Sequence, residues 1–263
     1  MEKNKKAVIT GATGKIGAAI AKEMAKKNYD LILIARNEHK VKNLADEILK
    51  KSGSAKVRYE VIDLESESAI KGLSTRIDSP VDVLINNAAI APVQREETSE
   101  GLEMQFAVNI MSYVWMTIEL YQNLKNAPRS RIVNVASYYA GDLDVYDLQF
   151  LEREYNNNTA YRQSKAANRI LSYCYSEEYK KNGITVNSCH PGEVNSNLSN
   201  DLGFGGYESP EKGAETPVWL ATDSYVNEAT GKYFEYLTPT SDRFSMNDEL
   251  NEALYQECMK YCS

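Results

Sequence analysis

Short apolar runs alternate with longer amphipathic stretches along most of the chain. The runs 6–10, 31–35 and 131–136 are mostly apolar, as expected of parallel strands that are covered on both faces. The stretches between them have the length and the apolar spacing of helices. This alternation predicts βαβ units and therefore an α/β fold. We expect a doubly wound parallel sheet of about seven strands, with helices on both faces.

The individual elements can be placed from these runs. Strands are expected over residues 6–10, 31–35, 57–62, 81–86, 131–136, 184–189 and 232–236. Helices are expected over residues 15–27, 38–51, 98–126 and 160–182, with a polar helix between the third and fourth strands. A last helix is predicted by the stripe Met246, Leu250, Leu254, Cys258 and Tyr261. Ser245, followed by Asp248, is its predicted N-cap.

Two polar stretches interrupt the alternation. Residues 141–159 are acidic and rich in Asn, and residues 195–206 are polar and rich in Gly. Both are expected at the surface. Long loops are often functional, so the first stretch could be either a plain surface loop or a lid or pocket wall.

The composition is that of an ordinary folded domain. The 263 residues are 43% hydrophobic and 25% charged, and no linker or repeat divides them, so we expect one domain. Thirty Lys and Arg stand against 37 Asp and Glu, a formal net charge of −7. Nucleic-acid binders are more often basic, so no nucleic-acid partner is expected.

The cysteines and the chain start indicate the compartment. The four cysteines, at positions 174, 189, 258 and 262, are too few for a disulfide scaffold, and His39 and His190 are isolated, so no metal site is expected. No apolar run approaches the roughly 18 residues that would span a bilayer. The basic start 1–6 leads to only three apolar residues, which is too short for a secretory signal. We therefore expect a cytoplasmic protein.

A glycine-rich turn follows the first expected strand. Thr10-Gly11-Ala12-Thr13-Gly14-Lys15-Ile16-Gly17 leads from that strand into a helix. Glycines there allow a tight turn and a close approach of the backbone to a pyrophosphate, beside the N–H groups of the helix N-terminus. The alternative of an NTPase phosphate loop fails, because Ile16 stands where Ser or Thr would bind magnesium. The turn predicts a dinucleotide site.

The end of the second strand indicates which dinucleotide. NAD-specific sites usually place an acid there for the ribose 2′-hydroxyl, whereas this chain reads Ala35-Arg36-Asn37. A guanidinium can hold the 2′-phosphate of NADP and stack on adenine. Lys15 adds a second cation to the same corner. NADP(H) is therefore expected rather than NAD(H).

Tyr161 and Lys165 share one face of an expected helix. A nearby ammonium favours a phenolate, so we expect Lys165 to lower the pKa of Tyr161 from about 10. Tyr161 would then be a usable general acid and base near neutral pH. The spacing alone is weak, because 18 tyrosines produce chance pairs such as Tyr121 and Lys125.

Taken together, these motifs resemble the short-chain dehydrogenase/reductase family over essentially the whole chain. The resemblance lies in their order: 10–17, Asp63-Leu64, 86–89, Asn109, Ser137, Tyr161 with Lys165, and Pro191-Gly192. The runs 101–106, 130–135, 164–168, 209–214 and 231–234 are most similar to the retinol dehydrogenase-like branch. The resemblance implies a single-domain Rossmann fold over residues 1–263. Residues 1–136 would mainly bind the dinucleotide, and residues 137–263 would mainly supply catalysis and substrate binding, with a lid near 193–210.

The resemblance also implies roles for single residues. Ser137 would hydrogen-bond the substrate oxygen, and Tyr161 would transfer the proton. Lys165 would hold the nicotinamide ribose, and Asn109 would anchor a water that relays protons. The implied cofactor residues are Gly11, Thr13, Gly14, Lys15, Ile16, Gly17, Arg36, Asp63, Leu64, Asn87, Ala88, Ala89, Tyr161, Lys165, Pro191, Gly192, Val194 and Ser196. The expected substrate residues are Ser137, Tyr138, Tyr139 and Glu193.

Two positions depart from the family pattern. Lys15 occupies the middle glycine position of the turn, with Gly14 one residue earlier, and Ala89 stands where a glycine is usual. The spacing of Gly11, Gly14 and Gly17 resembles that of the larger sugar-nucleotide-modifying relatives. Neither change removes a catalytic group.

Three functions compete on these observations. The leading hypothesis is an NADP(H)-dependent oxidoreductase acting on an alcohol, aldehyde or ketone. A non-catalytic NADP sensor is the second, although a sensor needs no proton relay. A sugar-nucleotide epimerase is the third, although only about 70 residues follow Pro191, which is small for the added substrate domain of that class. A homodimer or homotetramer through the expected helices 98–126 and 160–182 is implied by the resemblance, and the 141–159 stretch could block that packing.

Overall fold

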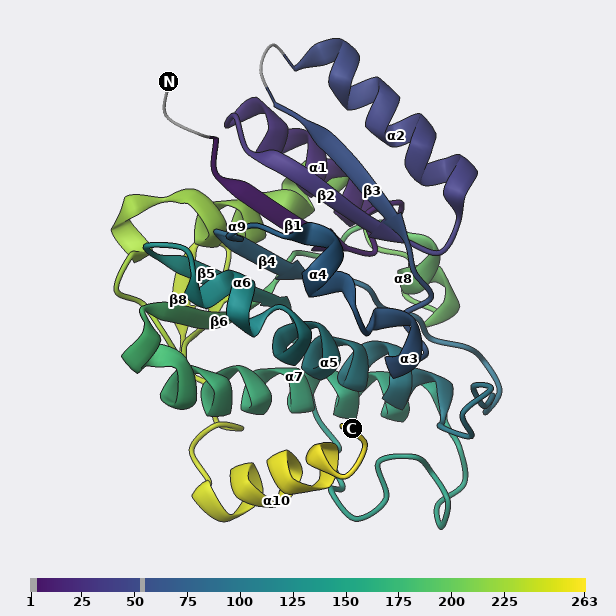
Figure 1. Cartoon of the computed structure of the whole chain (residues 1–263). Coiled ribbons are helices and arrows are strands. Elements are labelled where there is room, and N and C mark those ends of the chain that lie inside the picture. The colour runs from purple at the N-terminus through teal and green to yellow at the C-terminus, as the bar shows by residue number, and fades with distance from the viewer. Residues whose placement is uncertain (1–3, 53–54) are drawn as a thin grey trace.

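The computed structural model describes residues 4–52 and 55–263; the first three residues of the basic chain start lie outside that part. At its centre is one eight-stranded sheet in the order β3-β2-β1-β4-β5-β6-β7-β8 (Figure 1). β1 to β7 are parallel, and β8 runs antiparallel to β7. The strands are β1 (Lys6–Thr10), β2 (Asp30–Ala35), β3 (Val57–Val61), β4 (Val83–Asn86), β5 (Ser130–Val135), β6 (Ile184–His190), β7 (Tyr233–Glu235) and β8 (Thr238–Thr240). The predicted doubly wound sheet is confirmed, with one strand more than the expected seven.

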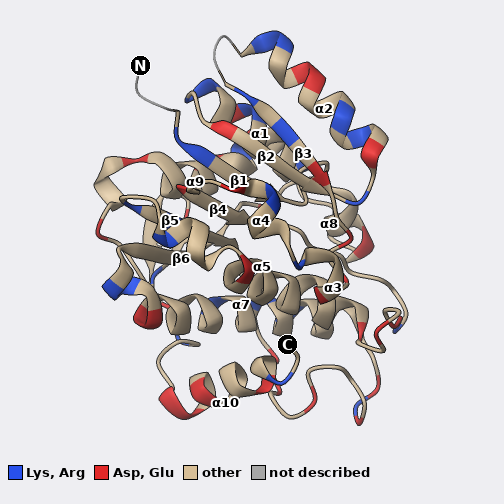
Figure 2. Ribbon diagram, in the orientation of Figure 1, with Lys and Arg blue, Asp and Glu red and all other residues tan. Residues whose placement is uncertain are grey.

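Helices cover both faces of the sheet, each over its own apolar core. One face carries α1 (Lys15–Lys26), α2 (Glu38–Lys51) and α9 (Pro210–Thr222). The other carries α3 (Glu67–Ile70), α4 (Leu73–Ile77), η1 (Phe106–Met111), α5 (Ser112–Glu119), α6 (Tyr121–Lys125) and α7 (Asn157–Tyr179). The short elements are η2 (Lys180–Asn182), α8 (Asn197–Asp201) and η3 (Ser224–Val226). In Figure 2 the central strand β4 is uncharged while α2 carries both signs, as expected of a covered strand and a surface helix.

The strand order creates a crevice at one edge of the sheet. From β1 the chain proceeds to β2 and β3 on one side, and β4 then pairs on the other side of β1. The loops that leave the carboxyl ends of β1 and β4 therefore turn away from each other. In open α/β sheets this switch point is where ligands bind.

The stretch expected as one helix over residues 98–126 is broken into several pieces. Its start is a turn, in which Leu102 N and Glu100 N donate to Thr98 Oγ1. The buried carboxylate of Glu103 then accepts the N–H groups of Gln105 at 2.9 Å and Phe106 at 2.6 Å, and the helical part begins there. It continues as the π-helical segment η1, then α5 and α6. The predicted helical stretch is confirmed from residue 104 onward, whereas its start at 98 was wrong because the apolar pattern does not record these side-chain caps.

The C-terminal helix α10 (Asp248–Met259) lies along the outer side of α7 (Figure 1). Its N-cap is Asn247, which accepts from Leu250 N, so the prediction of Ser245 was wrong. Leu254 and Cys258 are buried against α7 as the stripe predicted, whereas Met246 is 79% exposed. α10 therefore covers part of the surface that the sequence offered as a subunit interface.

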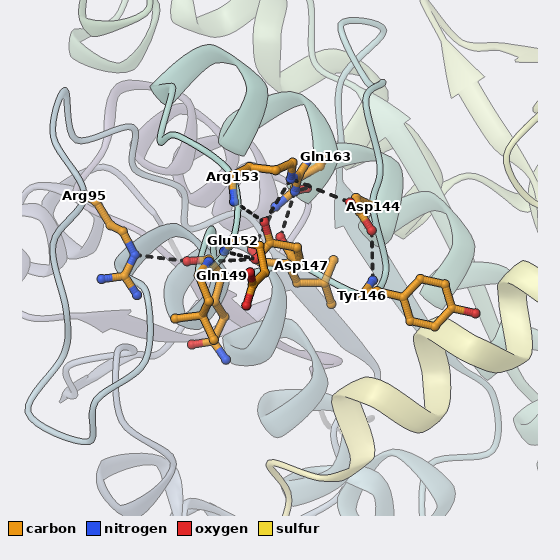
Figure 3. Close-up of polar contacts among 10 residues, drawn as sticks. Arg95, Asp144, Tyr146, Asp147, Gln149, Glu152, Arg153 and Gln163 are labelled. Atoms are coloured by element: carbon orange, nitrogen blue, oxygen red, sulfur yellow. Dashed lines mark hydrogen bonds and ion pairs between the residues drawn. The ribbon is translucent and has the colours of Figure 1, made fainter.

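Of the polar stretch 141–159, residues 141–156 form a packed loop rather than a pocket wall, and residues 157–159 begin α7. The carboxylate of Asp147 accepts from Leu151 N, Arg153 N and Arg153 Nε, which closes the loop on itself (Figure 3). Arg153 Nη2 also donates to Gln163 Oε1 on α7, at 3.0 Å. Apart from Tyr161, none of the residues from 141 to 164 lines either of the two cavities described below. The sequence left open a plain surface loop and a lid or pocket wall. The structure favours a surface loop, which packs against α7.

Candidate active site

A groove of about 540 Å³ opens at the switch point of the sheet. Its walls come from the segments that follow β1, β2, β3 and β4, as the strand order requires. It is closed on one side by the first residues of α8. The expected cofactor residues that line it are Gly11, Thr13, Gly14, Lys15, Ile16, Gly17, Arg36, Asp63, Leu64, Asn87, Ala88, Ala89 and Ser196.

The glycine-rich turn is built for close packing. Gly11 has a φ of +62°, and a Cβ there would lie 2.7 Å from Ala88 Cα. A Cβ on Gly17 would lie 2.2 Å from Gly11 O. Asn87 Nδ2 donates to Thr10 O at 3.0 Å and to Gly11 O at 3.3 Å, which joins this turn to the end of β4. α1 begins after it without a side-chain cap, so the groove holds the uncapped N-terminus of a twelve-residue helix, which suits an anionic diphosphate.

Lys15 is accommodated without strain. Its backbone is not among the positive-φ residues, so a side chain at this position requires no left-handed conformation. Its Nζ donates to Asn195 O at 2.9 Å. The side chain therefore runs from the start of α1 to the segment before α8, and the missing glycine leaves the turn intact.

Two cations line the groove beyond β2. Arg36 follows the buried Ala35, and Lys40 lies one helical turn further on, in α2. Asn37 caps α2 by accepting from Lys40 N at 2.9 Å, which fixes this corner. Sequence reasoning missed Lys40, although its place in the first turn of the expected helix 38–51, shortly after Arg36, could have shown it. The lining holds one acid here, Asp63.

A second cavity of about 280 Å³ continues from the groove. The two share Ile16, Asn87, Ala89, Ser196 and Leu198. The second cavity brings together the predicted Ser137 at the end of β5 with Tyr161 and Lys165 of α7. The other expected residues that line it are Tyr138, Tyr139, Pro191, Gly192, Glu193 and Val194.

Burial controls the ionisation of Tyr161 and Lys165. Lys165 Nζ donates to Val135 O at 3.0 Å and lies 5.5 Å from the centre of the Tyr161 ring. Burial lowers the pKa of Lys165 to about 7. Burial also raises the pKa of Tyr161, to about 12, although a hydrogen bond with Ser137 offsets part of that rise. The prediction that Lys165 lowers the pKa of Tyr161 is wrong for the protein without a cofactor. The Lys165 ammonium donates to the Val135 carbonyl, and the burial of Tyr161 has the larger effect on its pKa.

Asn109 lies beside the site rather than in it. It is fully buried in the π-helical segment η1, a type of distortion common near functional sites. Its Oδ1 accepts from Ile90 N and its Nδ2 donates to Ile90 O, both at 2.9 Å. Asn109 thus positions Ile90, which lines the groove after β4. The oxygen and the nitrogen of the Asn109 amide are both used in this contact. The role of Asn109 in anchoring a water stays a prediction.

The end of β6 and the segment after it supply cavity residues that the sequence reasoning missed. His190, directly before Pro191-Gly192, is 4% exposed and lines the catalytic cavity, and neither ring nitrogen has a hydrogen-bond partner. Burial, together with the charge of Arg169, lowers its pKa to about 4. Leu202 and Phe204, from the Gly-rich stretch, line the same cavity. In the described part of the chain, no three His, Cys, Asp or Glu side chains come together as metal ligands.

Comparison with known proteins identifies the family. The family model of the short chain dehydrogenases matches residues 5–203. Retinol dehydrogenase 13 of Mus musculus is 31% identical, over 93% of this chain and 79% of its own length. A probable oxidoreductase of Streptomyces antibioticus is 29% identical, over 88% of this chain and 84% of its own.

Two solved structures show the same fold. An uncharacterised protein of Mycobacterium paratuberculosis has a TM-score of 0.81 and 25% identity, covering 98% of this chain and 92% of its own. L-Sorbose reductase of Gluconobacter frateurii, complexed with NADPH and L-sorbose, has a TM-score of 0.73 and 21% identity, covering 93% and 98%.

The chain belongs to the short-chain dehydrogenase family, and it is an oxidoreductase with a nicotinamide cofactor and a small-molecule substrate. Within that family it is retinol dehydrogenase-like in sequence, as the motifs had indicated. No helix among residues 4–52 and 55–263 is long and apolar enough to cross a membrane.

Proposed function

We propose that this protein is an NADP(H)-dependent oxidoreductase that interconverts an alcohol and its carbonyl compound, with Tyr161 as the general acid and base. The observation that carries the cofactor preference is the pair of cations, Arg36 and Lys40, that line the groove beyond β2. An acid at that place would repel a 2′-phosphate, whereas a guanidinium can bind it with two parallel hydrogen bonds.

The groove residues bind and orient the dinucleotide. The uncapped start of α1 and Lys15 suit its diphosphate, and Lys165 is the residue for the nicotinamide ribose. When bound, the nicotinamide supplies the hydride that a carbonyl carbon accepts. Pro191, Gly192 and Val194 line the cavity in which this ring would lie.

The catalytic side chains handle the proton. A pKa of about 12 keeps the Tyr161 phenol protonated at neutral pH, so it is ready to donate to the oxygen of a carbonyl substrate. Ser137 hydrogen-bonds the same oxygen and holds it beside the phenol.

The competing functions fit the site less well. An epimerase of the larger class needs a separate substrate domain, whereas in the described residues β7 and β8 belong to the one sheet, α9 packs on it and α10 packs on α7. A sensor would have no use for buried Ser137, Tyr161 and Lys165 in one cavity.

The proposal is tested by titrating the purified protein with NADPH and, in parallel, with NADH, and following cofactor fluorescence. The bound cofactor is then challenged with a panel of aldehydes and ketones. Tighter binding of NADPH and its oxidation by a panel member would support the enzyme. Tight binding without oxidation by any member would favour the sensor, and no binding of either cofactor would refute the proposal.

A further inference from the structure

Two carboxylates lie at the mouth of the catalytic cavity. Glu193 lines the cavity directly after Gly192. Glu208 lies next to Glu193, and Glu208 Oε2 accepts a hydrogen bond from Glu193 N at 2.5 Å. A Cβ on Gly192 would lie 2.3 Å from that oxygen, so glycine at this position leaves the room that the carboxylate occupies. The second carboxylate is therefore held in place by the backbone of the first.

Neither carboxylate is neutralised by the described part of the chain. No Lys, Arg or His there lies within ion-pair distance of Glu193 or Glu208. Lys212 interacts with the charge of Glu208 but forms its ion pair with Glu215, at 2.6 Å, and Arg169 lies 3.7 Å from Glu235 and 3.6 Å from Asp242. The mouth of the cavity is thus a region of negative charge.

Three tyrosines surround the same mouth. Tyr138 donates its hydroxyl to Glu193 Oε1 at 2.8 Å, and this hydrogen bond raises its pKa to about 12. Burial raises the pKa of Tyr236, and the neighbouring Glu208, Tyr207 and Glu193 raise it further. The phenols of Tyr138 and Tyr236 therefore remain neutral, and Tyr138, Tyr207 and Tyr236 are all well exposed.

Tyr236 has a strained backbone conformation. It forms, with Leu237, the two-residue turn between β7 and β8, and their φ values are +46° and +63°. Such a turn normally takes Asn or Gly, because other side chains are strained there. Strain of this kind is typical of functional sites, and here it presents an aromatic ring next to the catalytic cavity.

His190 lies below these rings and provides an independent sign of a ligand. Its ring centre is 4.6 Å from that of Tyr138 and 5.9 Å from that of Tyr236, both edge to face. It is nearly completely buried, yet both of its ring nitrogens are without partners, and it lines the cavity. A buried polar group without a partner is costly, so this part of the cavity wall is not fully satisfied by the described part of the chain.

We propose that this acidic aromatic mouth, made of Glu193, Glu208, Tyr138, Tyr207 and Tyr236 above His190, selects a substrate that carries an ammonium group beyond the reacting carbonyl or alcohol. The inference rests on the proposed function for the reaction itself. Neutral aromatic faces attract cations, and unpaired carboxylates add a charge attraction that a neutral group lacks.

Binding tests the inference without any turnover. Choline and 3,3-dimethylbutan-1-ol have the same shape and differ in charge, so isothermal titration of both at one ionic strength isolates the cation. We expect choline to bind roughly tenfold more tightly, a difference of about 1.4 kcal/mol, which lies within the range of a cation–π contact. 2-Dimethylaminoethanol, which adds an N–H to the cation, should bind at least as tightly as choline. Equal or weaker binding of choline would overturn the inference.

Kinetics test it in the reaction. Betaine aldehyde and 3,3-dimethylbutanal form the matching substrate pair, and the readout is the ratio of their kcat/KM values with NADPH. We expect Glu193→Gln, which keeps an acceptor for Tyr138, to lower the ratio several-fold. Glu257→Gln on α10, distant from the cavity, removes the same charge and should leave the ratio unchanged.

The two proposals fail in different ways. Reduction of 3,3-dimethylbutanal without preference for its cationic partner overturns the inference and leaves the oxidoreductase standing. Preferential binding of choline without reduction of either aldehyde, or of any panel member, supports the cationic site and counts against the proposed reaction.

Discussion

Lys15 Nζ donates a hydrogen bond to Asn195 O at 2.9 Å, joining the start of the first helix to a segment 180 residues further along the chain. Lys15 lines the dinucleotide groove, and the residues after Asn195 form its opposite wall. The position that is usually glycine in this family therefore holds a side chain that ties the two walls together.

We expect Lys15→Gly to weaken NADPH binding, because it removes both this tie and a cation next to the expected diphosphate. A loss of one charge-assisted hydrogen bond predicts a rise in the Kd of roughly tenfold, with a smaller change in kcat. Fluorescence titration measures the Kd. Lys15→Arg, which keeps the charge and the reach, should retain most of the affinity, and an unchanged Kd in the glycine variant would show that the tie has no part in binding.

Arg36→Asp should change the cofactor preference. The substitution replaces the expected partner of the 2′-phosphate by an acid, which repels that phosphate and can accept from the 2′-hydroxyl of NAD. We expect the ratio of kcat/KM for NADPH over NADH to fall roughly 10- to 100-fold. Lys40→Ala should lower the same ratio by a smaller factor. A ratio that does not move would refute the assignment of this corner to the 2′-phosphate.

Glu103 makes a prediction about stability and pH. Burial raises its pKa from 4.5 to about 7, against the hydrogen bonds of Gln105 N and Phe106 N. The folded protein then holds a proton that the unfolded chain releases between pH 4.5 and 7, so this residue causes stability to fall as the pH rises through that window. The loss is on the order of 3 kcal/mol at about 1.4 kcal/mol per pH unit.

Glu103→Gln removes this titration while keeping an acceptor for the start of the helix. We expect urea unfolding to show that the difference in unfolding free energy between variant and wild type grows in favour of the variant from pH 5 to pH 8. A difference that is the same at both pH values would mean that Glu103 ionises normally in the folded protein.

Much of the groove was predictable because its chemistry lies in short local motifs. The glycines at 11 and 17 are required by contacts with Ala88 Cα and Gly11 O, and a tight βα turn leaves that mark in the sequence. The convergence of Ser137, Tyr161 and Lys165 followed from the strand order, since β5 and α7 deliver them to the same edge of the sheet.

The remaining features depend on long-range contacts that no local pattern records. The start of η1 is set by the carboxylate of Glu103, and the 141–159 loop is held by Asp147 and Arg153 against α7. The pKa of Tyr161 follows from burial by the whole fold, and so its direction was predicted wrongly from the nearby lysine. His190 was considered only as an isolated metal ligand, whereas its position in the cavity depends on β6 and the hairpin beyond it.

The most direct test of the central claim is a single-turnover measurement on Tyr161→Phe. NADPH is bound to wild type and to the variant, its affinity is measured in both, and its oxidation after mixing with a panel aldehyde is followed by stopped flow. The account predicts an affinity close to that of wild type and an oxidation rate lower by about 100-fold or more, as expected for the loss of a general acid. Oxidation at the wild-type rate by the phenylalanine variant would contradict the assignment of Tyr161 as the proton donor.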